Sequence, residues 1–325
     1  MIQAGIVGGT GYVAGELIRI LIHHQEVNIN FVYSHSQAGK KVMDVHQDLF
    51  TNPELQFTDK INPDVDVVFL CLGHGNSNKF LDEHQFSEST KIIDLSNDFR
   101  LKENESFQDK KFVYGLVEKN KELVEQAQYI ANPGCFATAI QLGLLPLAAQ
   151  NLLQDEVHIH GITGSTGAGQ SMAETTHFSW RNGNVSVYKP FIHQHLAEIG
   201  QTLEPYGNDL KNKLNFIPVR GNFTRGIFIS IYTNCDLPEE ELVTLYKTFY
   251  KESVFTIVSD SSIHLKQVVN TNYCLLHVEK HENKVLITSA IDNLLKGAAG
   301  QAVENMNLTF GFAPDAGLNF KPNYF

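Results

Sequence analysis

A cluster of glycines near the N-terminus is the feature that most limits what this chain can fold into. An apolar run over residues 2–7 meets Gly8, Gly9 and Gly11, and apolar residues then recur at helical spacing over 17–22. A strand, a glycine turn and a helix in this order let backbone amides approach a pyrophosphate at the helix N-terminus. The spacing departs from the strict GxGxxG pattern, but its place between a first strand and a helix indicates dinucleotide binding.

The first half of the chain shows the pattern of a parallel sheet. Apolar runs continue at residues 29–33, 65–72 and 92–95, and polar or helix-patterned stretches separate them. Short apolar strands that alternate with helices are typical of a sheet with crossover helices on both faces. We therefore predict a doubly wound α/β domain.

The second half shows a different pattern. Longer alternating strands are expected at residues 226–233, 272–279 and 284–291, with one amphipathic helix over 239–250. Such alternation favours a mixed, largely antiparallel sheet in an α+β domain. Near the C-terminus, residues 296–308 again show a helical pattern.

Bulk composition narrows the class of protein. The 325 residues suit two domains of roughly 150 residues each. A net charge of −11 argues against nucleic acid and anionic lipid as partners. No apolar run is long enough to span a membrane and no signal sequence precedes the first strand, so we expect a cytoplasmic protein. No metal site or disulfide framework is expected, because no CxxC pair occurs among the four cysteines, Cys71, Cys135, Cys235 and Cys274.

The segment after the second strand predicts which dinucleotide is bound. Residues 34–41 contain Ser34, Ser36 and Lys40 but no acidic residue. A carboxylate there would hold the ribose hydroxyls of NAD, whereas hydroxyls and an ammonium suit the 2′-phosphate of NADP. We therefore expect NADP.

Cys135 is the candidate nucleophile. Pro133 and Gly134 mark a bend between a strand and an apolar helix that begins at the cysteine. A thiol at a helix N-terminus feels the positive end of the helix dipole, which favours the thiolate. Cys71, within an apolar run, fits the alternative of an inert buried cysteine.

A thiolate nucleophile needs a positioned base, and His193, His195 and Glu198 supply candidates. Two histidines at this spacing on a helix would point to different sides, so both are not expected to serve one role. Which of them meets the thiol is left open.

Arg100 is the candidate anion anchor. It follows a buried strand, and the carboxyl edge of a doubly wound sheet is where such folds bind ligands. The guanidinium fork bonds phosphate or carboxylate bidentately. The alternative is an internal salt bridge to Asp94 or Asp98.

Several separated segments together resemble the N-acetyl-γ-glutamyl-phosphate reductase family and span almost the whole chain. Their order and number make the resemblance specific. Two departures stand out: Val117 replaces a frequent proline, and Gln194 replaces a frequent arginine between the histidines. The segments are GTGYVAGELIRIL near the start, CLGHGNS at 71–77, DLSNDFRL at 94–101, YGLVE at 114–118, NPGCFAT around Cys135, GSTGAG at 164–169, HQHLAEI at 193–199 and NLLKGAAGQAVENMN at 293–307.

The resemblance implies a domain division and an activity. Residues 1–147 plus 296–325 would form the NADP-binding domain, and 148–295 the catalytic, substrate and dimerisation domain of a homo-oligomer, a dimer or tetramer. Cys135 would attack an acyl phosphate, phosphate would leave, and NADPH would reduce the thioester to N-acetylglutamate semialdehyde, with histidine as acid and base. This reaction belongs to arginine biosynthesis.

The resemblance also implies site residues. The catalytic group would be Cys135, His193, His195 and Glu198. Substrate would meet Arg100, Arg225, Asn97, Gly134 and Tyr188. The cofactor would meet Gly8, Thr10, Gly11, Tyr12, Val13, Ser34, Ser36, Lys40, His74, Gly75, Ser165, Gly167, Asn293, Lys296, Gly297 and Gly300.

Two other functions remain open from sequence. Aspartate-semialdehyde dehydrogenase is similar in fold and cysteine chemistry, although the HQHLAEI and GAAGQAVENMN segments favour the acetylglutamyl enzyme. A non-catalytic NADP-binding regulator with Cys135 as a redox-sensitive thiol belongs to another class. A paired-histidine segment together with Arg100 argues against it.

Overall fold

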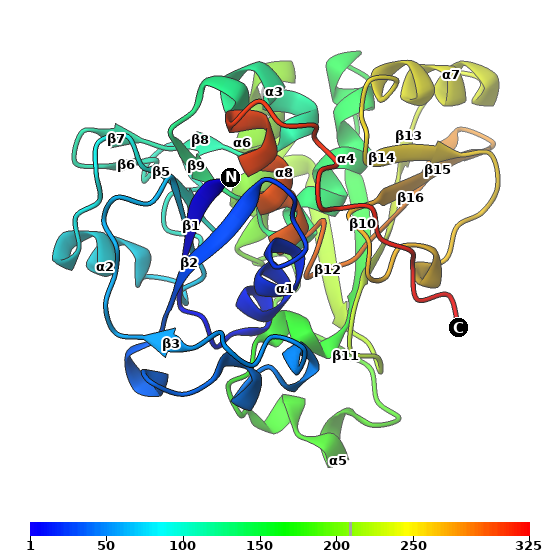
Figure 1. Ribbon diagram of the computed structural model, residues 1–325. Helices are drawn as coiled ribbons and strands as arrows, with labels where there is room; N and C mark the ends of the chain where they lie inside the picture. Colours follow the sequence, from blue (N-terminus) through cyan, green and yellow to red (C-terminus); the bar gives the residue numbers. More distant parts are fainter. Residues whose placement is uncertain (208–209) are drawn as a thin grey trace. The chain divides into compact units, whose positions relative to one another are not determined.

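A computed structural model describes residues 1–207 and 210–325 (Figure 1). The chain forms two compact units. The first contains Met1–Pro133 and Ala298–Asn319, and the second contains Gly134–Gly297 and Phe320–Phe325. Each unit is built on its own seven-stranded sheet.

The sheet of the first unit is parallel throughout. Its order is β3-β2-β1-β4-β5-β9-β8, with β1 in the middle, and every neighbouring pair is parallel. This order reverses direction at β1, as in doubly wound dinucleotide-binding folds, and confirms the predicted fold class. The strands are β1 Ile2–Val7, β2 Val27–Tyr33, β3 Phe57–Thr58, β4 Val67–Leu70, β5 Lys91–Asp94, β8 Val113–Tyr114 and β9 Tyr129–Ala131, with a separate hairpin of β6 Ser106–Phe107 and β7 Lys110–Lys111.

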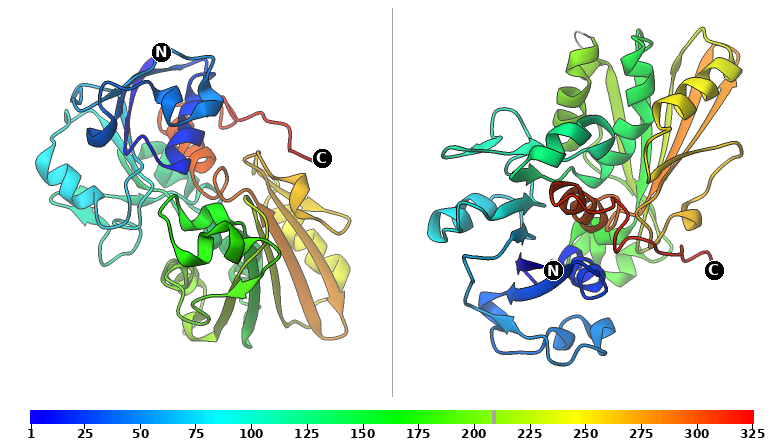
Figure 2. Two further views of the ribbon diagram at one scale, coloured as in Figure 1. Left: turned by 90° about the horizontal axis from the view of Figure 1, so that it is seen from below. Right: turned by 45° about the horizontal axis from the view of Figure 1, so that its top comes forward.

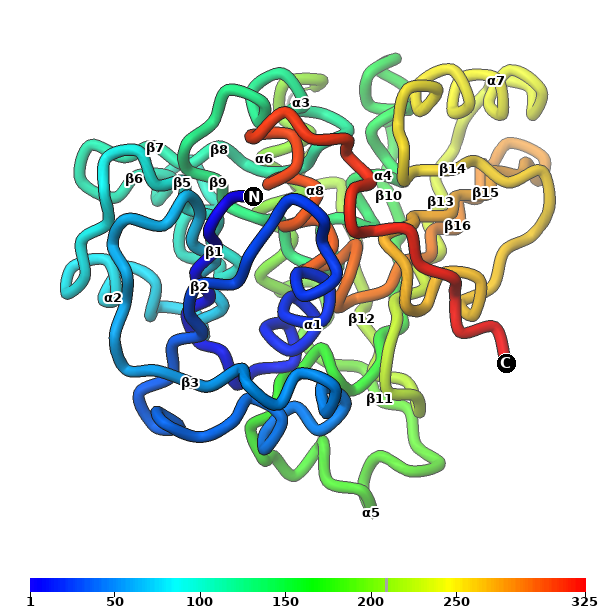
Figure 3. The backbone as a smooth tube through the Cα atoms, viewed as in Figure 1, coloured from blue at the N-terminus to red at the C-terminus, as the bar shows by residue number. Residues whose placement is uncertain are grey.

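The last helix belongs to this first unit. Helix α8 (Ala299–Thr309) packs against α1 (Tyr12–Leu21) and α3 (Val117–Gln126), and the backbone trace shows the orange-red α8 close to the blue α1 (Figure 3). The side-chain amide of Asn305 donates to Gly115 O at 3.0 Å, which satisfies a carbonyl 190 residues away. A shorter helix, α2 (Ser77–Glu83), follows β4.

The sheet of the second unit is mixed and largely antiparallel, as predicted. Its order is β11-β12-β10-β13-β16-β15-β14, and only the β10–β12 and β14–β15 pairs are parallel. The orange strands β15 and β16 run side by side in both views of Figure 2. The strands are β10 Val157–Thr163, β11 Ser186–Val187, β12 Leu214–Arg220, β13 Ile227–Asn234, β14 Thr256–Ser259, β15 Cys274–His281 and β16 Lys284–Ile291.

Helix α4 (Cys135–Ala149) is the core of the second unit. It is apolar all round and packs against β13, β16 and α6 (His195–Leu203), so nearly every side chain is buried. Pro146 lacks the N–H that would bond Leu142 O, and the phenol of Tyr250 donates to that carbonyl at 2.5 Å instead. Helix α7 (Glu239–Phe249) packs on β14 and β15.

The two units differ from the sequence-based division in where α4 lies. The division at residue 147 placed this helix with the N-terminal domain, whereas its contacts are with the second sheet. An all-apolar helix must be covered on every side, and the mixed sheet together with α6 and α7 provides that cover. No helix among the described residues is long and apolar enough to cross a membrane.

The glycine turn generates a stability prediction. Gly8 has φ +79°, and a Cβ there would lie 2.7 Å from the carbonyl oxygen of Cys71. Gly39 has φ +81° but open space around it. Gly39→Ala should therefore cost only backbone strain of about 1–2 kcal/mol, and Gly8→Ala should cost clearly more. Urea unfolding of both variants checks this, and equal losses would show that the clash is relieved without cost.

Candidate active site

Cys135 is the first residue of α4. Gly134 is extended, with φ −73° and ψ 149°, and its carbonyl accepts the Thr138 N–H at 2.8 Å, so the chain turns directly into the helix. The sulfur therefore lies where the helix dipole is positive, as the sequence predicts. A Cβ added at Gly297 would lie 2.7 Å from the Cys135 Cβ, so only glycine fits beside this cysteine.

Glu198 connects the turn before Cys135 to a histidine. Its Oε2 accepts the Gly134 N–H at 2.9 Å, and its Oε1 lies 3.8 Å from His195 Nε2. The residue is 3% exposed. Gln141 of α4 holds α6 in place by donating to Glu198 O at 3.1 Å and to Thr202 Oγ1 at 3.0 Å. Gln141 was missed from sequence, although a lone amide in an all-apolar helix was a signal.

The two histidines lie on the same side, and the expectation that they point apart is wrong. His195 begins α6, but His193 precedes the helix, so the helical period does not apply to the pair. Their ring centroids are 4.7 Å apart at 75°. The His195 backbone N–H donates to His193 Nδ1 at 3.2 Å.

His193 is held neutral. Burial lowers its pKa from 6.5 to about 4, and the charge of Lys189 lowers it further while Glu198 acts in the opposite direction. The rings of Phe136 and Phe216 both lie 5.5 Å from it. Because Nδ1 accepts a hydrogen bond, the neutral ring carries its proton on Nε2.

Tyr188 borders the same cluster. Its ring lies 5.8 Å from that of His193. Burial raises the pKa of Tyr188, the charge of Cys135 raises it further, and Arg220 partly offsets this. The phenol therefore keeps its proton and can donate a hydrogen bond.

Arg225, Asn293 and the 164–167 segment come together near the start of β13. Arg225 Nε lies 2.6 Å from Asp292 Oδ2, a fully buried carboxylate that the sequence reasoning missed. Asn293 accepts the Gly226 N–H at 2.6 Å and donates to Thr166 Oγ1 at 3.0 Å. Ser165 and Gly167 lie in the 3-10 turn Ser165–Ala168. Lys296 is fully buried, with its ammonium 5.7 Å from the Phe255 ring centroid.

In the first unit, the glycine turn has the form expected for a phosphate site. Gly8 and Gly9 donate to Tyr33 O at 3.1 and 3.0 Å, and Gly11 is the N-cap of α1, with nothing within 4 Å of an added Cβ. Thr10, Tyr12 and Val13 lie at the same turn and helix start. His46 donates from Nε2 to Gly9 O at 2.7 Å and so stabilises the turn. The sequence did not identify this residue.

The other residues that the sequence predicts to bind the cofactor's 2′-phosphate lie in the segment after β2. Ser34 is buried, whereas Ser36 and Lys40 are exposed. Lys40 donates to Gln37 Oε1 at 3.0 Å. These side chains are thus at the carboxyl edge of the sheet, where a dinucleotide ribose would lie.

The loops after β4 and β5 gather at the same edge of that sheet. Asp98 caps α2 by accepting the N–H groups of Gly75, Ser77 and Asn78, and Asn97 N–H donates to His74 Nδ1 at 3.2 Å. Burial raises the pKa of Asp94 to about 6, although Ser77, Ser96 and Arg100 oppose this.

Arg100 is buried in the same loop region. It donates from Nε to Asn132 O at 2.8 Å and from Nη2 to Leu95 O at 3.0 Å. These carbonyl bonds fix the guanidinium at the sheet edge. The thiol of nearby Cys71 has its pKa raised by burial and by Asp94, which favours its protonated form.

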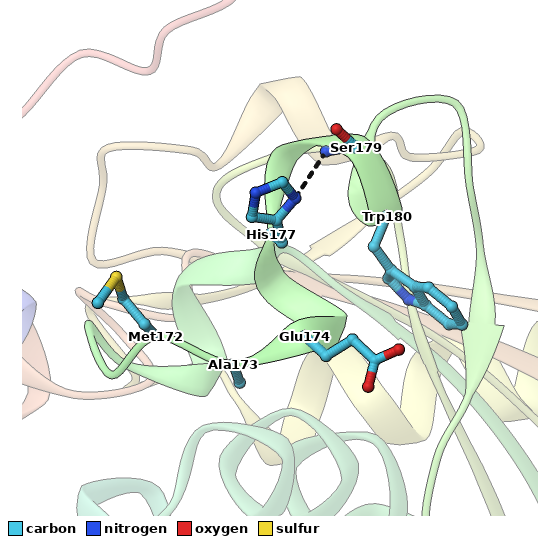
Figure 4. A pocket seen from close by; sticks show the side chains of 6 residues that line it. All are labelled: Met172, Ala173, Glu174, His177, Ser179 and Trp180. Atoms are coloured by element: carbon cyan, nitrogen blue, oxygen red, sulfur yellow. Dashed lines mark hydrogen bonds between the residues drawn. The ribbon is translucent and has the colours of Figure 1, made fainter.

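A separate hollow of about 560 Å³ lies on the segment 172–180 of the second unit (Figure 4). Glu174 and Trp180 border it, and His177 accepts the Ser179 N–H at 3.3 Å. None of the predicted site residues lines it. The residues around it are Met172, Ala173, Glu174, His177, Ser179 and Trp180.

Comparison with known families defines the class. Residues 3–127 match the model described as semialdehyde dehydrogenase, NAD binding domain, and residues 135–293 match semialdehyde dehydrogenase, dimerisation domain. The first match covers the parallel sheet except β9, and the second covers the mixed sheet. Together they identify the class as that of the semialdehyde dehydrogenases.

Relatives narrow the family. The chain is 59% identical over all 325 residues to N-acetyl-gamma-glutamyl-phosphate reductase of Christiangramia forsetii, and 58% identical to that of Flavobacterium johnsoniae, again with both chains fully covered. The chain belongs to the N-acetyl-gamma-glutamyl-phosphate reductase family.

Solved structures agree on the fold. Aspartate semialdehyde dehydrogenase II of Vibrio cholerae complexed with ASA has a TM-score of 0.71 at 15% identity, covering 96% of this chain and 98% of that one. The aspartate semialdehyde dehydrogenase of Candida albicans with NADP has a TM-score of 0.64 at 16% identity, covering 95% and 98%.

The neutral state of His193 generates a pH prediction. Because the folded pKa lies below the ordinary value of 6.5, protons favour the unfolded chain, and this contribution to stability falls by about 1.4 kcal/mol per unit as pH drops from 6.5 towards about 4. The His193→Asn variant keeps a hydrogen-bond acceptor for the His195 N–H. Its free energy of unfolding should therefore depend less on pH between 6.5 and about 4. Urea unfolding across this range checks it, with exposed His281→Asn as control. An NMR titration of His193 at its ordinary pKa would contradict the prediction.

Proposed function

We propose that this chain catalyses the NADPH-dependent reduction of N-acetyl-γ-glutamyl phosphate to the semialdehyde and phosphate, with Cys135 as nucleophile. The observation that carries the proposal is the buried Glu198 carboxylate, which joins the Cys135 turn to His195. A nucleophile at a helix start with an oriented histidine is the arrangement that covalent acyl transfer needs. The relatives at 51–59% identity carry this name.

The chemistry follows from the thiolate. Cys135 attacks the acyl carbon, the bond to phosphate breaks, and phosphate leaves with that electron pair, so a thioester remains on the sulfur. A thioester accepts hydride more readily than a carboxylate does. When bound, the nicotinamide cofactor would supply the hydride, which would add to the thioester carbon so that the carbon–sulfur electron pair can return to the sulfur. The carbon–sulfur bond then breaks, the semialdehyde leaves and Cys135 is regenerated.

His195 is the proposed acid and base. Its Nε2 faces Glu198 at 3.8 Å, and a carboxylate partner orients an imidazole and stabilises its protonated form. His193, neutral with a proton on Nε2, would donate a hydrogen bond to the substrate carbonyl or to the oxyanion. Tyr188 would donate from its phenol.

The residues of the glycine turn, of the segment after β2 and of the loop at Arg100 are proposed to bind the cofactor and the substrate. The glycine turn would hold the pyrophosphate, and Ser34, Ser36 and Lys40 the 2′-phosphate that makes NADP the cofactor. Arg100 would hold the substrate phosphate, with Asn97 beside it. Arg225 is already paired with Asp292, and Gly134 N–H with Glu198, so both would act by shaping the site.

The function is tested by phosphate-dependent reduction of NADP with N-acetylglutamate semialdehyde. Wild-type protein should turn over, and Cys135→Ser should bind NADPH with similar affinity but turn over at least about 10³-fold more slowly, because an alcohol is a poor nucleophile near neutrality. Cys71→Ser is the matched control and should retain activity, since that thiol is held protonated.

Three outcomes would overturn parts of this proposal. Faster turnover of aspartate semialdehyde would assign the chain to the aspartyl substrate. Full alkylation of Cys135 without loss of turnover would support a regulatory thiol. A higher kcat/KM with NAD than with NADP would overturn the cofactor choice.

We further propose a cytoplasmic homo-oligomer that assembles through the second unit. Its sheet has helices on one face, and Tyr232 is 43% exposed, stacked on His158 at 4.7 Å on the strand face that alternates with the buried one. Light scattering should give the mass of two or more chains. Tyr232→Glu should lower it, whereas Tyr324→Glu, at a residue 44% exposed near the C-terminus, should not. A single-chain mass for wild type at tens of μM would contradict this.

A further inference from the structure

A fully buried carboxylate lies at the end of β5 in the first unit. Asp94 is 0% exposed, and each of its oxygens accepts a hydrogen bond from a serine hydroxyl. Ser77 Oγ donates to Oδ1 at 2.6 Å, and Ser96 Oγ donates to Oδ2 at 2.7 Å. Ser77 is the first residue of α2, which follows β4, and Ser96 lies in the loop after β5. The Asp94 carboxylate therefore joins two segments that follow neighbouring parallel strands.

Asp98 joins the same two segments a second time. Its backbone N–H donates to Ser96 Oγ at 3.1 Å. Its carboxylate accepts the Gly75 and Ser77 N–H groups at 2.6 and 3.0 Å. Hydrogen bonds to a charged acceptor are roughly twice as strong as those between neutral groups. The loops after β4 and β5 are thus held together through Asp94 and through Asp98.

These two loops carry groups that are proposed to contact ligands. The loop after β4 contains His74 and Gly75, and the loop after β5 contains Arg100. The loop after β4 also borders the glycine turn, because a Cβ added at Gly8 would lie 2.7 Å from the carbonyl oxygen of Cys71. Whatever fixes the two loops therefore also fixes residues of the proposed cofactor and phosphate sites.

The charge on Asp94 does not serve stability. Burial raises the pKa of Asp94 to about 6, although the Ser77 and Ser96 hydroxyls and the charge of Arg100 lower it. The Cys71 thiol also faces this carboxylate, since its pKa is raised by burial and then by Asp94. Because the folded pKa of Asp94 lies above the ordinary 3.8, ionisation costs stability as pH rises through about 6. Only the ionised carboxylate, however, accepts both hydroxyls without carrying a donor of its own.

We infer that Asp94 is a positioning residue for ligand binding: through the hydroxyls of Ser77 and Ser96 it holds the loops after β4 and β5 in the arrangement that binds the nicotinamide cofactor and the substrate phosphate. This inference rests on the proposed function. Because Asp94 is fully buried, it acts through the two loops and not by contact with a ligand. Ligand-binding groups depend on such supporting hydrogen bonds for their geometry.

The test compares Asp94→Asn with wild type in a fluorescence titration with NADPH at neutral pH. Asparagine has the same shape but brings N–H donors to a place where two hydroxyls need acceptors. The dissociation constant of NADPH and the KM for phosphate should each rise at least about fivefold. The free energy of unfolding in urea should be unchanged or higher, because the buried charge is gone. Asp82→Asn, at an exposed acid of α2, is the matched control and should change none of these values.

A serine variant and a pH series test the same contacts. Ser96→Ala should also weaken NADPH binding, and its effect combined with Asp94→Asn should be less than additive. As the pH falls below the Asp94 pKa of about 6, the ratio of the dissociation constants of Asp94→Asn and wild type should fall towards one, because a protonated carboxyl also carries a donor. Groups that titrate in both proteins cancel in this ratio. Ser89→Ala, which removes an exposed hydroxyl bonded to Ser87, is the control.

Three results would overturn the inference. The first is an unchanged dissociation constant in Asp94→Asn. The second is a free energy of unfolding that falls together with the affinity, because Asp94 would then support only the fold. The third is a ratio of dissociation constants that stays constant as the pH is lowered. Circular dichroism identifies a variant that fails to fold, and Ser96→Ala then decides.

Amide hydrogen exchange without cofactor separates this inference from the proposed function. The N–H groups of Gly75, Ser77 and Asn78, which Asp98 accepts, should exchange faster in Asp94→Asn than in wild type. If wild type bound no NADPH, the proposed function would fail, whereas faster exchange would still support the role of Asp94 in holding the loops. Unchanged exchange in a protein that binds NADPH would refute the inference and leave the proposed function standing.

Discussion

The Glu198 carboxylate is the group on which the arrangement of the side chains around Cys135 depends. It accepts the amide of Gly134, which sets the turn into α4 and the place of Cys135, and it faces His195 on the helix that Gln141 fastens to α4. A buried carboxylate is stable there because an N–H and the positive end of a helix dipole compensate its charge. One side chain thus links the turn before Cys135 to His195.

Charge in this chain is distributed unevenly, and the distribution suits an anionic substrate. The net charge is −11, yet Arg181 and Arg220 lie together without an acidic partner in the described residues, and His193 is kept neutral by burial. Because solvent and salt screen charges that lie more than about 10 Å away, two guanidinium groups near a ligand outweigh distant surface carboxylates. Local placement, and not net charge, decides which ligand is attracted.

The fold alone does not decide the substrate. Aspartate semialdehyde dehydrogenases share this architecture at about 15% identity, so the parallel sheet and the mixed sheet serve more than one acyl phosphate. What can separate substrates is the side chains around the nucleophile, because one ionic contact made or missing changes transition-state binding by orders of magnitude. We propose Tyr188, beside His193, as one of these side chains.

The sequence by itself determined the strand, glycine turn and helix at the N-terminus, both sheet types and the place of Cys135 at a helix start. These features follow from local periodicity and from turn residues, which act over a few positions. Only the tertiary structure decided that His193 and His195 face one another, that Asp292 pairs with Arg225 across 67 residues, and that His46 supports Gly9 from 37 residues away. Those contacts depend on how distant strands and loops meet, and hydrogen bonds of this kind leave no period in the sequence.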